Sequence, residues 1–348
     1  MPKKKVNVGI VGMGIGKPNA LAITRHAQGH VAALCDLDEG RMAEFAAELP
    51  GEVKTYTDYK AMCKDPELDA IFVGTPNQLH VPVALEAVRR DKHVMVTKPL
   101  ADSERAALRL VDAADRSGVV NMMSLSTRFS PACQYLHEQS RAGYFGELYY
   151  ARARSVRRNG IPAWNLGFIK EGGGAFRDMG VHVLDAAWSL LGFPRPVSAT
   201  GVAGAHFGPQ GKGYSRPVTR ATYRQFAADD YAGGFIRFAG GLGLQVESFW
   251  ASHQPGEMQI ELFGTQAGAS YNPLKLYSTV DGVEQDTTVN LRHQPEAWDN
   301  IAGHFIDCIL NGTSCTAPLS HGLQVQVMME ALLKSAGTGR EVRIKGGG

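Results

Sequence analysis

A lysine, a histidine and an aspartate stand in patterns that suit proton transfer on a substrate hydroxyl. Lys98 directly precedes Pro99, after the apolar run at 94–97. Because proline restricts the residue before it to extended backbone, the amine would be held in one place. Asp178 and His182 are four residues apart, which places both on one face of a helix. Histidine exchanges protons near neutral pH, so the set favours general acid–base chemistry. Taken singly, a solvated strand-end lysine and a helix N-cap aspartate are the commoner interpretations.

A glycine-rich loop, GMGIGKPN at 12–19, could hold a nucleotide. Gly12 and Gly14 match the opening of a dinucleotide fingerprint, in which glycines let the backbone turn sharply and approach a pyrophosphate. The usual third glycine would fall at Lys17, whereas Gly16 comes one residue early. We interpret this as a loop shortened by one residue. Alone, the motif also fits a simple tight connection between a strand and a helix.

Asp36 strengthens the nucleotide interpretation. It ends the apolar run 30–36, roughly 20 residues beyond the glycine loop, where a carboxylate can accept a hydrogen bond from a ribose 2′-hydroxyl. A carboxylate at this position would repel a 2′-phosphate, so NAD is favoured over NADP.

The elements that position these residues alternate between strand and helix patterns in the first third of the chain. Apolar runs predict strands at 6–12, 30–36, 69–76, 93–99 and 119–125. Helical spacing recurs between them, at 40–49, 80–90 and 103–118. Such alternation predicts a doubly wound parallel sheet with right-handed crossovers, whose ligands bind beyond the carboxyl ends of the strands. Lys98 would therefore emerge in the cofactor crevice.

The remaining chain has a different pattern. Strands with short turns are predicted at 147–156, 230–239, 241–250 and 257–264, and helices at 296–312 and 323–337. A further helix is expected to begin near 178, with Asp185 on the same face as Asp178 and His182.

Composition excludes several classes of function. The 348 residues carry a net charge of +2, which gives no electrostatic case for a nucleic-acid or membrane partner. No apolar stretch is long enough to span a membrane. The five cysteines have no CxxC spacing, so we expect reduced thiols in a cytoplasmic protein and no metal site. The lysines at 3–5 and the glycines at 346–348 are interpreted as solvated ends.

Five longer segments, taken in their order along the chain, indicate a protein family. They are TPNQLHVPVALEAV (75–88), DKHVMVTKPLA (91–101), RFSPA (128–132), GGGAFRDMGVHVLDAAWSLLG (172–192) and GREVRI (339–344). Together they resemble the Gfo/Idh/MocA family of oxidoreductases, over nearly the whole chain. The resemblance implies an NAD-binding Rossmann domain at 1–123. It also implies an α+β substrate domain at 124–348, built on a large open, mostly antiparallel sheet that supports a homodimer or homotetramer.

The resemblance also implies roles for individual residues. Lys98 matches the family lysine that contacts cofactor and substrate hydroxyl, although Thr97 replaces the usual glutamate before it. Asp178 and His182 match the family's D-x-G-x-H segment. The expected cofactor contacts are Gly12, Gly14, Ile15, Gly16, Asp36, Thr75, Asn77, His80, Lys98 and Trp164. The expected substrate contacts are Lys98, Arg128, Asp178 and His182. A surface arginine is an equally good interpretation of Arg128, and a lid or core aromatic is an equally good interpretation of Trp164.

The function these observations predict is NAD-dependent hydride transfer between nicotinamide and the carbon that bears a secondary hydroxyl of a sugar, sugar derivative or cyclitol, in a direction that the sequence leaves open. Lys98 and His182 are expected to meet over the nicotinamide, and which of them takes the proton stays open. One alternative is a redox-neutral glycosidase, epimerase or lyase that retains NAD and works through a transient keto-sugar. Another is a noncatalytic cofactor-binding regulator, against which the joint presence of Lys98, Asp178 and His182 argues.

Overall fold

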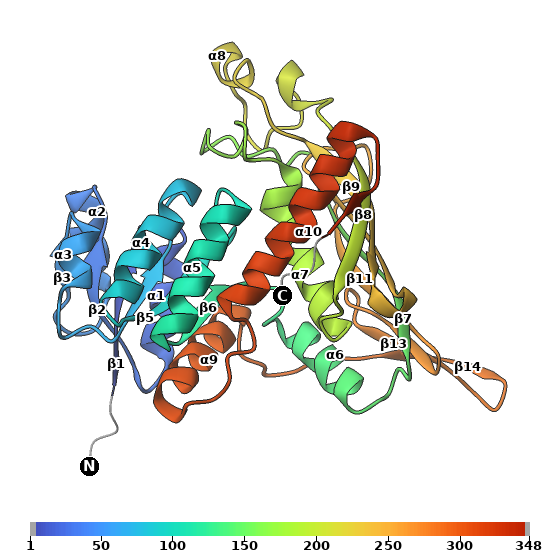
Figure 1. Ribbon diagram of the computed structural model, residues 1–348, viewed down its shortest axis with the longest axis horizontal. Coiled ribbons are helices and arrows are strands. Elements are labelled where there is room, and N and C mark those ends of the chain that lie inside the picture. Colours follow the sequence, from blue (N-terminus) through green and yellow to red (C-terminus); the bar gives the residue numbers. More distant parts are fainter. Residues whose placement is uncertain (1–4, 345–348) are drawn as a thin grey trace. The chain divides into compact units, whose positions relative to one another are not determined.

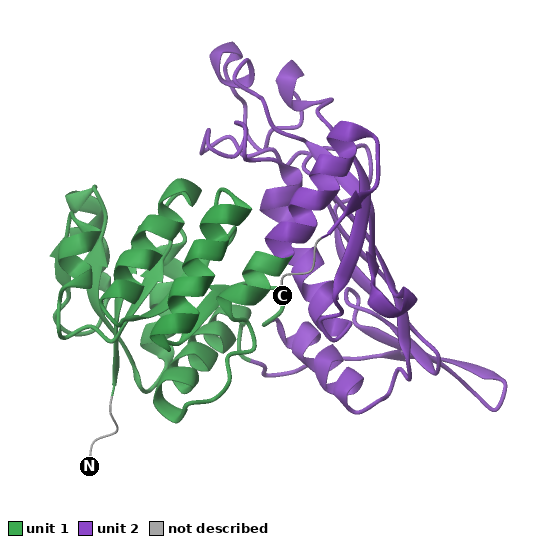
Figure 2. Cartoon of the chain, viewed as in Figure 1, with its two compact units in different colours: residues 1–129, 295–324 green, residues 130–294, 325–348 purple. Residues whose placement is uncertain are grey.

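The chain forms two compact units in a computed structural model that describes residues 5–344 (Figure 2). Unit 1 comprises residues 1–129 and 295–324, and unit 2 comprises residues 130–294 and 325–348. Lys3, Lys4 and the glycines at 346–348 lie outside the described residues. Within the described range, no helix combines the length and the apolarity needed to cross a membrane.

Unit 1 is built on a six-stranded parallel sheet in the order β3-β2-β1-β4-β5-β6 (Figure 1). Its strands are β1 (Val6–Val11), β2 (Gly29–Cys35), β3 (Lys54–Tyr56), β4 (Ala70–Val73), β5 (His93–Thr97) and β6 (Asn121–Ser124). The central strand β4 is buried at every position, as expected for a sheet covered on both faces. The predicted doubly wound domain is confirmed. Its topological switch point lies between β1 and β4, where such sheets bind ligands.

Helices cover both faces of this sheet. One layer contains α1 (Gly16–Arg25), α2 (Glu39–Glu48) and α9 (Ala297–Asn311), whose side chains share one hydrophobic core with the sheet. The other layer contains α3 (Tyr59–Cys63), α4 (Asn77–Arg89) and α5 (Glu104–Ser117). Local signals set the helix ends. For example, the Ser103 hydroxyl accepts a hydrogen bond from the Ala106 N–H at the start of α5, and Gly118 ends it with φ 69°.

Helix α9 reaches unit 1 from far along the chain. Ile301, Phe305 and Ile306 are fully buried in the core that α1 and β1 also line. Arg25 Nε donates to Asp299 Oδ1 at 2.7 Å, which joins α1 to α9. Residues 295–324 thus belong to the first compact unit, while the functional boundary predicted after residue 123 stays a prediction.

Unit 2 contains a nine-stranded sheet in the order β14-β13-β12-β11-β7-β10-β9-β8-β15. Its strands are β7 (Leu148–Val156), β8 (Pro196–Gly204), β9 (Tyr231–Phe238), β10 (Gly243–Phe249), β11 (Glu257–Gly264), β12 (Ala267–Ser270), β13 (Lys275–Val280), β14 (Val283–Thr288) and β15 (Val342–Arg343). Among the described strands of this sheet, only the neighbours β7 and β10 run parallel. The predicted open, mostly antiparallel sheet is confirmed.

The two faces of this sheet differ in chemistry. Along β7, Ala151 and Ala153 are buried, while Arg152 and Arg154 point to the opposite face. The covering helices are α6 (Pro131–Arg141), α7 (Val181–Leu190) and the later part of α10 (Leu319–Thr338). A short helix, α8 (Arg220–Tyr223), lies in the long connection before β9. The opposite face carries these arginines and the neighbouring rings of Tyr150, Phe235 and Phe263, so it is charged and aromatic, and the covered face is apolar.

Candidate active site

The glycine loop of unit 1 follows β1 and leads into α1. Gly12 has φ 91°, and a Cβ there would lie 2.5 Å from the Gly74 carbonyl oxygen. Apart from the two chain neighbours of Gly14, no heavy atom of residues 5–344 lies within 4 Å of a Cβ built on this glycine, so the position faces open space. A Cβ on Gly16 would lie 2.8 Å from Ile10 Cγ2, because α1 packs closely on β1. These are the three tasks of a dinucleotide fingerprint: a tight turn, access for a pyrophosphate, and close packing of helix on strand. Gly16 performs the third task one residue early.

The Asp36 carboxylate lies against this loop. Its Oδ2 accepts a hydrogen bond from the Met13 N–H at 2.7 Å, and its Oδ1 accepts one from the Asp38 N–H at 3.2 Å. The side chain is half-buried at the end of β2, which pairs directly with β1. The predicted proximity of the glycines and the carboxylate is present. A carboxylate oxygen has more than one lone pair, so Asp36 keeps acceptor capacity for a ribose hydroxyl.

His80 ties the ends of β4 and β5 together. Its Nδ1 lies 2.7 Å from the Pro99 carbonyl oxygen, and its Nε2 lies 2.7 Å from the Thr75 carbonyl oxygen. The ring is fully buried, and this burial lowers the pKa of His80. A neutral imidazole has one N–H, so it donates to one of these carbonyls at a time. The geometry makes His80 a positioning residue for the segment that carries Lys98.

The same edge of the sheet offers polar groups to a ligand. Thr75 Oγ1 is buried and has no hydrogen-bond partner among residues 5–344. Buried hydroxyls are nearly always paired, so an orphaned one at the switch point suits a polar atom of a bound nucleotide. Asn77 begins α4, whose N-terminus has no side-chain cap. Lys98 follows β5 and is half-buried, and its peptide bond to Pro99 is cis.

Ile15, the residue before α1, also belongs to this edge. Its carbonyl accepts a hydrogen bond from Asn19 Nδ2 at 2.9 Å, and its side chain lies beside Gly74. The N-terminus of α1 likewise has no side-chain cap, so its backbone N–H groups remain available to an anion. Unit 1 thus gathers the loop, Asp36, Thr75 and Lys98 at the carboxyl ends of its strands. The residues present fit a bound dinucleotide.

In unit 2, Asp178 lies in a π-helical turn, Phe176–Gly180, that leads into α7. Asp178 Oδ2 accepts a hydrogen bond from Trp250 Nε1 at 3.0 Å. Trp250 is fully buried after β10, and Ser248 of that strand donates to the Ala175 carbonyl at 2.9 Å. Strand β10 therefore fixes the Asp178 carboxylate in direction. Single π turns of this kind are frequent at functional sites.

A second carboxylate holds the start of this turn. Asp229 Oδ2 accepts a hydrogen bond from the Phe176 N–H at 3.0 Å, and the Asp229 carbonyl accepts one from the Ala175 N–H at 3.0 Å. Burial raises the pKa of the Asp229 carboxyl group. Gly174 has φ 109°, and a Cβ there would overlap the Asp229 side chain. Sequence reasoning missed Asp229, Ser248 and Trp250, because nothing local links them to residue 178.

The helix predicted to begin near 178 is present as the π turn and α7, and one of its three predicted polar residues is buried. His182 lies in the first turn of α7 and is half-buried. Asp185 is fully buried, because α7 is packed on nearly every side. Asp178 and His182 are therefore the partly exposed members of the predicted polar face, and Asp185 is its buried member.

Two further predicted contacts have distinct environments. Trp164 is 61% exposed, and its ring meets Phe168 edge-on at 6.5 Å between centroids. Arg128 is 4% exposed; its Nη1 donates to the Thr316 carbonyl at 2.8 Å and lies 3.1 Å from His321 Nδ1. The Arg128 guanidinium therefore helps to hold the loop before α10. Ligand contacts by Trp164 and Arg128 stay predictions.

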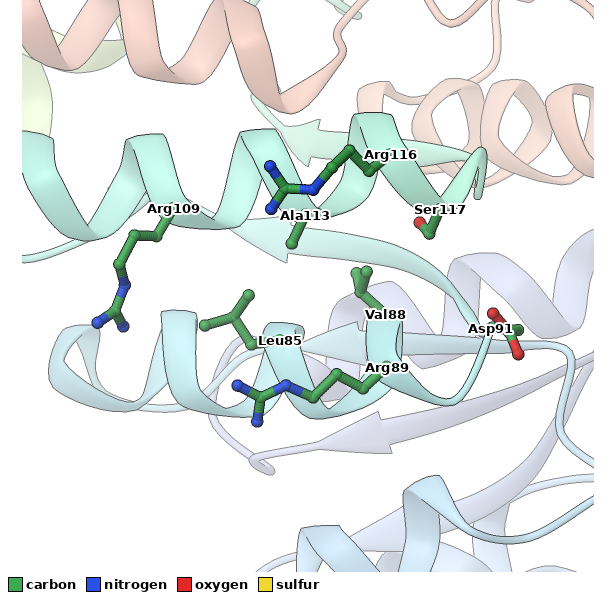
Figure 3. A pocket seen from close by; sticks show the side chains of 8 residues that line it. All are labelled: Leu85, Val88, Arg89, Asp91, Arg109, Ala113, Arg116 and Ser117. Carbon is green, nitrogen blue, oxygen red and sulfur yellow. The ribbon is translucent and has the colours of Figure 1, made fainter.

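An open pocket of unit 1 lies away from the glycine loop (Figure 3). It sits between the C-terminal halves of α4 and α5, whereas Asn77 begins α4. Its lining residues are Leu85, Val88, Arg89, Asp91, Arg109, Ala113, Arg116 and Ser117. None of them belongs to the predicted site.

Two family models match consecutive parts of this chain. Residues 6–125 match the family model described as oxidoreductase family, NAD-binding Rossmann fold. Residues 133–270 match the GFO/IDH/MocA C-terminal domain.

The chain belongs to the Gfo/Idh/MocA family.

Individual Gfo/Idh/MocA relatives match this protein over most of its length. D-glucoside 3-dehydrogenase of Escherichia coli (strain K12) is 30% identical over 355 residues, which cover 99% of each chain. The scyllo-inositol 2-dehydrogenase (NAD(+)) of Bacillus subtilis (strain 168) is 25% identical over 315 residues, covering 88% of this chain and 87% of that one. Among solved structures, levoglucosan dehydrogenase in complex with NADH and levoglucosan superposes with a TM-score of 0.87 at 22% identity, covering 99% of this chain and 100% of that one. The last likeness shows the shared fold.

The predictions of family, of an oxidoreductase and of an NAD-binding domain are confirmed. The cytoplasmic location and the oligomeric state stay predictions.

Proposed function

We propose that this protein oxidises a secondary hydroxyl group of a sugar, sugar derivative or cyclitol with NAD. The observation that carries the proposal is the cluster of glycine loop, Asp36 and Thr75 at the switch point of a parallel sheet. The relatives named above are dehydrogenases of a glucoside and of an inositol, which supports the substrate class. When bound, NAD supplies the hydride acceptor. The protein supplies binding, orientation and proton handling.

The nucleotide half of the proposed site lies in the domain at 1–123. The backbone around Gly12, Gly14, Ile15 and Gly16 would hold the pyrophosphate, and Asp36 would accept from a ribose hydroxyl. Thr75 and Asn77 would contact the second ribose, supported by the orphaned Thr75 hydroxyl. His80 would act through the carbonyls that it contacts, and Trp164 would contribute an exposed ring.

The substrate half lies mainly in the domain at 124–348. We assign His182 the role of general acid/base, because imidazole exchanges protons near neutral pH. Asp178, held by Trp250, would accept hydrogen bonds from substrate hydroxyls or orient His182. Lys98 would donate to the reacting oxygen and stabilise the charge that develops there. Arg128 is the further proposed substrate contact.

The direct test is NADH formation with a panel of sugars, glycosides and inositols. Lys98→Met should lower kcat/KM by about 100-fold or more, because it removes a donor to the developing oxyanion. Lys92→Met is the matched control, since Lys92 Nζ donates to the Leu68 carbonyl in the same unit. Its kcat/KM should stay near that of the parent. Unchanged activity in Lys98→Met would end this mechanism.

The same panel separates net oxidation from the redox-neutral alternative. A dehydrogenase forms NADH in proportion to the substrate consumed, whereas a cycling enzyme converts substrate with retained cofactor and no net NADH. Substrate turnover without NADH would overturn the proposal.

The assignment of the base needs a pH profile. His182→Asn should remove the limb of the kcat/KM profile that reports the imidazole, while Asp178→Asn should keep that limb and raise KM. Should the limb persist in His182→Asn and vanish in Lys98→Met, the lysine would be the base.

We also propose that the charged and aromatic face of the unit 2 sheet forms the interface of a homodimer or homotetramer. Arg152 pairs with Glu261 at 3.0 Å and Arg154 with Glu257 at 2.8 Å on this face. Tyr150 lies beside them, stacked on a neighbouring phenylalanine. Light scattering should report a dimer or tetramer that dissociates in Tyr150→Glu. A monomeric parent protein would contradict this proposal.

A further inference from the structure

Helix α9 and the loop that follows it bring one imidazole and two thiols together. His304 and Cys308 are one turn apart on α9, and Cys315 lies in the connection to α10. One ligand atom from each of the three side chains lies within 4.8 Å of the other two. Cys308 Sγ is 3.6 Å from His304 Nε2. None of these residues belongs to the proposed NAD or substrate site.

The separation of sulfur and nitrogen matches a tetrahedral metal site. Zinc binds cysteine sulfur at about 2.3 Å and histidine nitrogen at about 2.0–2.1 Å, nearly always with tetrahedral geometry. Two such ligands at a tetrahedral angle are about 3.5–3.6 Å apart, as follows from those bond lengths. The observed 3.6 Å therefore needs little adjustment to admit an ion between the two atoms.

Hydrogen bonds around the cluster hold the ligands in a suitable state. The Thr316 N–H donates to His304 Nε2 at 2.9 Å, so Nε2 carries a lone pair rather than a proton. A metal ion would take this lone pair, and the Thr316 N–H would then release it. The Thr313 hydroxyl donates to Cys308 Sγ at 3.6 Å. Hydrogen bonds to the ligands are typical of metal sites, where they orient the ligands.

The loop that supplies Cys315 is fixed independently of the cluster. The Arg128 guanidinium donates to the Thr316 carbonyl, and the Met123 N–H donates to the Ala317 carbonyl at 2.8 Å. Asn121 Oδ1 accepts from the Leu319 N–H at 2.9 Å. The loop is thus anchored to β6 and to the segment after it, so Cys315 is held next to α9 before any ion binds.

Both thiols are sheltered from solvent. Cys308 is buried and Cys315 half-buried. Cysteine binds a metal ion as the thiolate, so metal binding at this cluster would release protons.

We propose that His304, Cys308 and Cys315 form a zinc site that fastens the α9–α10 connection to α9. The ligand pattern is H-x3-C-x6-C, with a fourth position open to water or to a neighbouring threonine hydroxyl. This pattern has no CxxC spacing, which is why sequence reasoning expected no metal. The ion would stabilise unit 1 from the helix layer that packs on α1, so it would act on folding rather than on hydride transfer.

The test is metal binding to the full-length protein with its thiols reduced. Co²⁺ is the first probe, because tetrahedral thiolate coordination produces visible ligand-field bands and near-ultraviolet charge-transfer bands. Zn²⁺ should bind in one equivalent and abolish these bands by displacement. Cys308→Ser and Cys315→Ser should each weaken Zn²⁺ binding by about 100-fold or more, because even outer-shell changes cost 10–100-fold. Cys63→Ser, at a buried free cysteine elsewhere in unit 1, is the matched control.

Thermal unfolding provides a readout independent of activity. Zn²⁺ should raise the melting temperature of the parent protein and of Cys63→Ser, and should leave Cys315→Ser unchanged. NAD binding by Cys315→Ser verifies that this variant is folded. The proposal is overturned if the reduced protein gives no charge-transfer bands, or if the serine variants bind Zn²⁺ as tightly as the parent. Isolation of a Cys308–Cys315 disulfide whose reduced form does not bind Zn²⁺ would also overturn it.

Discussion

Two alanine substitutions in the glycine loop separate the requirements of folding from those of cofactor binding. In Gly12→Ala, the new Cβ would lie 2.5 Å from the Gly74 carbonyl oxygen and 2.7 Å from its carbon, both backbone atoms. The φ of 91° adds strain of about 1–2 kcal/mol for a residue with a side chain. Overpacking adds roughly 1–3 kcal/mol more. We therefore expect Gly12→Ala to lower the free energy of unfolding by about 2–5 kcal/mol.

Gly14→Ala, two residues away, should impair NAD binding while leaving the free energy of unfolding almost unchanged. Apart from the two chain neighbours, its Cβ would meet no atom of the described residues within 4 Å, and its φ lies outside the left-handed region, so the methyl group has room. The free energy of unfolding should change by no more than about 0.5 kcal/mol. The same methyl group would occupy the space through which a pyrophosphate approaches the backbone. We expect the dissociation constant for NAD to rise about tenfold or more, equivalent to about 1.4 kcal/mol.

Urea unfolding without NAD measures the first quantity, and calorimetric titration with NAD measures the second. We expect Gly14→Ala to be stable but to bind NAD poorly, and Gly12→Ala to be destabilised. If Gly14→Ala bound NAD as tightly as the parent, the open space beside Gly14 would not be the path of the pyrophosphate. Equal destabilisation by both substitutions would refute the assignment of separate tasks.

Three further predictions concern unit 1. His80→Leu should lower the free energy of unfolding by about 1–3 kcal/mol in urea, because it removes the one N–H that the neutral ring donates to the Pro99 or Thr75 carbonyl; an unchanged free energy of unfolding would contradict this positioning role. Burial, and then the charge of Arg128, lower the pKa of His321 from 6.5 to about 4. Between these two pH values the unfolded chain binds a proton at His321 and the folded chain does not. The free energy of unfolding therefore falls as the pH drops from 6.5 to about 4. After allowance for solvent screening, this loss should be about 1 kcal/mol between pH 7 and 5, and urea titrations of His321→Gln should show it diminished. Phe305→Ala should cost about 3–5 kcal/mol in urea unfolding, and a near-neutral result would contradict the packing of α9 on unit 1.

The amino-acid sequence by itself determined the architecture of unit 1 and much of its cofactor loop. The apolar runs that became β1, β2, β4, β5 and β6 were readable because strands buried on both faces are nearly continuous in hydrophobicity. Gly12, Gly14 and Asp36 were readable because the turn and the carboxylate follow consecutive strands at set positions. The roles predicted for Asp178 and His182 rest on the resemblance of ordered motifs to a family. Such motifs indicate the family, but they do not give the positions of the side chains in space.

Other features required the tertiary structure. The strands β12, β13 and β14 are short or exposed, so their pattern is weak, and β8 contains glycines that interrupt it. The π turn at Phe176–Gly180 depends on Asp229, which is distant in sequence. That turn and the packing around α7 leave Asp178 partly exposed and Asp185 buried.

Long-range packing also decided what α9 does. Its helical spacing predicted a helix, but the spacing does not say that Phe305 enters the core of the nucleotide-binding sheet. Nor do the positions of His304, Cys308 and Cys315 in the sequence reveal that their ligand atoms converge, because a loop held by Arg128 brings the third one back. Periodicity reports which residues share a face of one element. Which faces meet is decided by the burial of apolar surface across the whole chain, and only the folded structure displays that outcome.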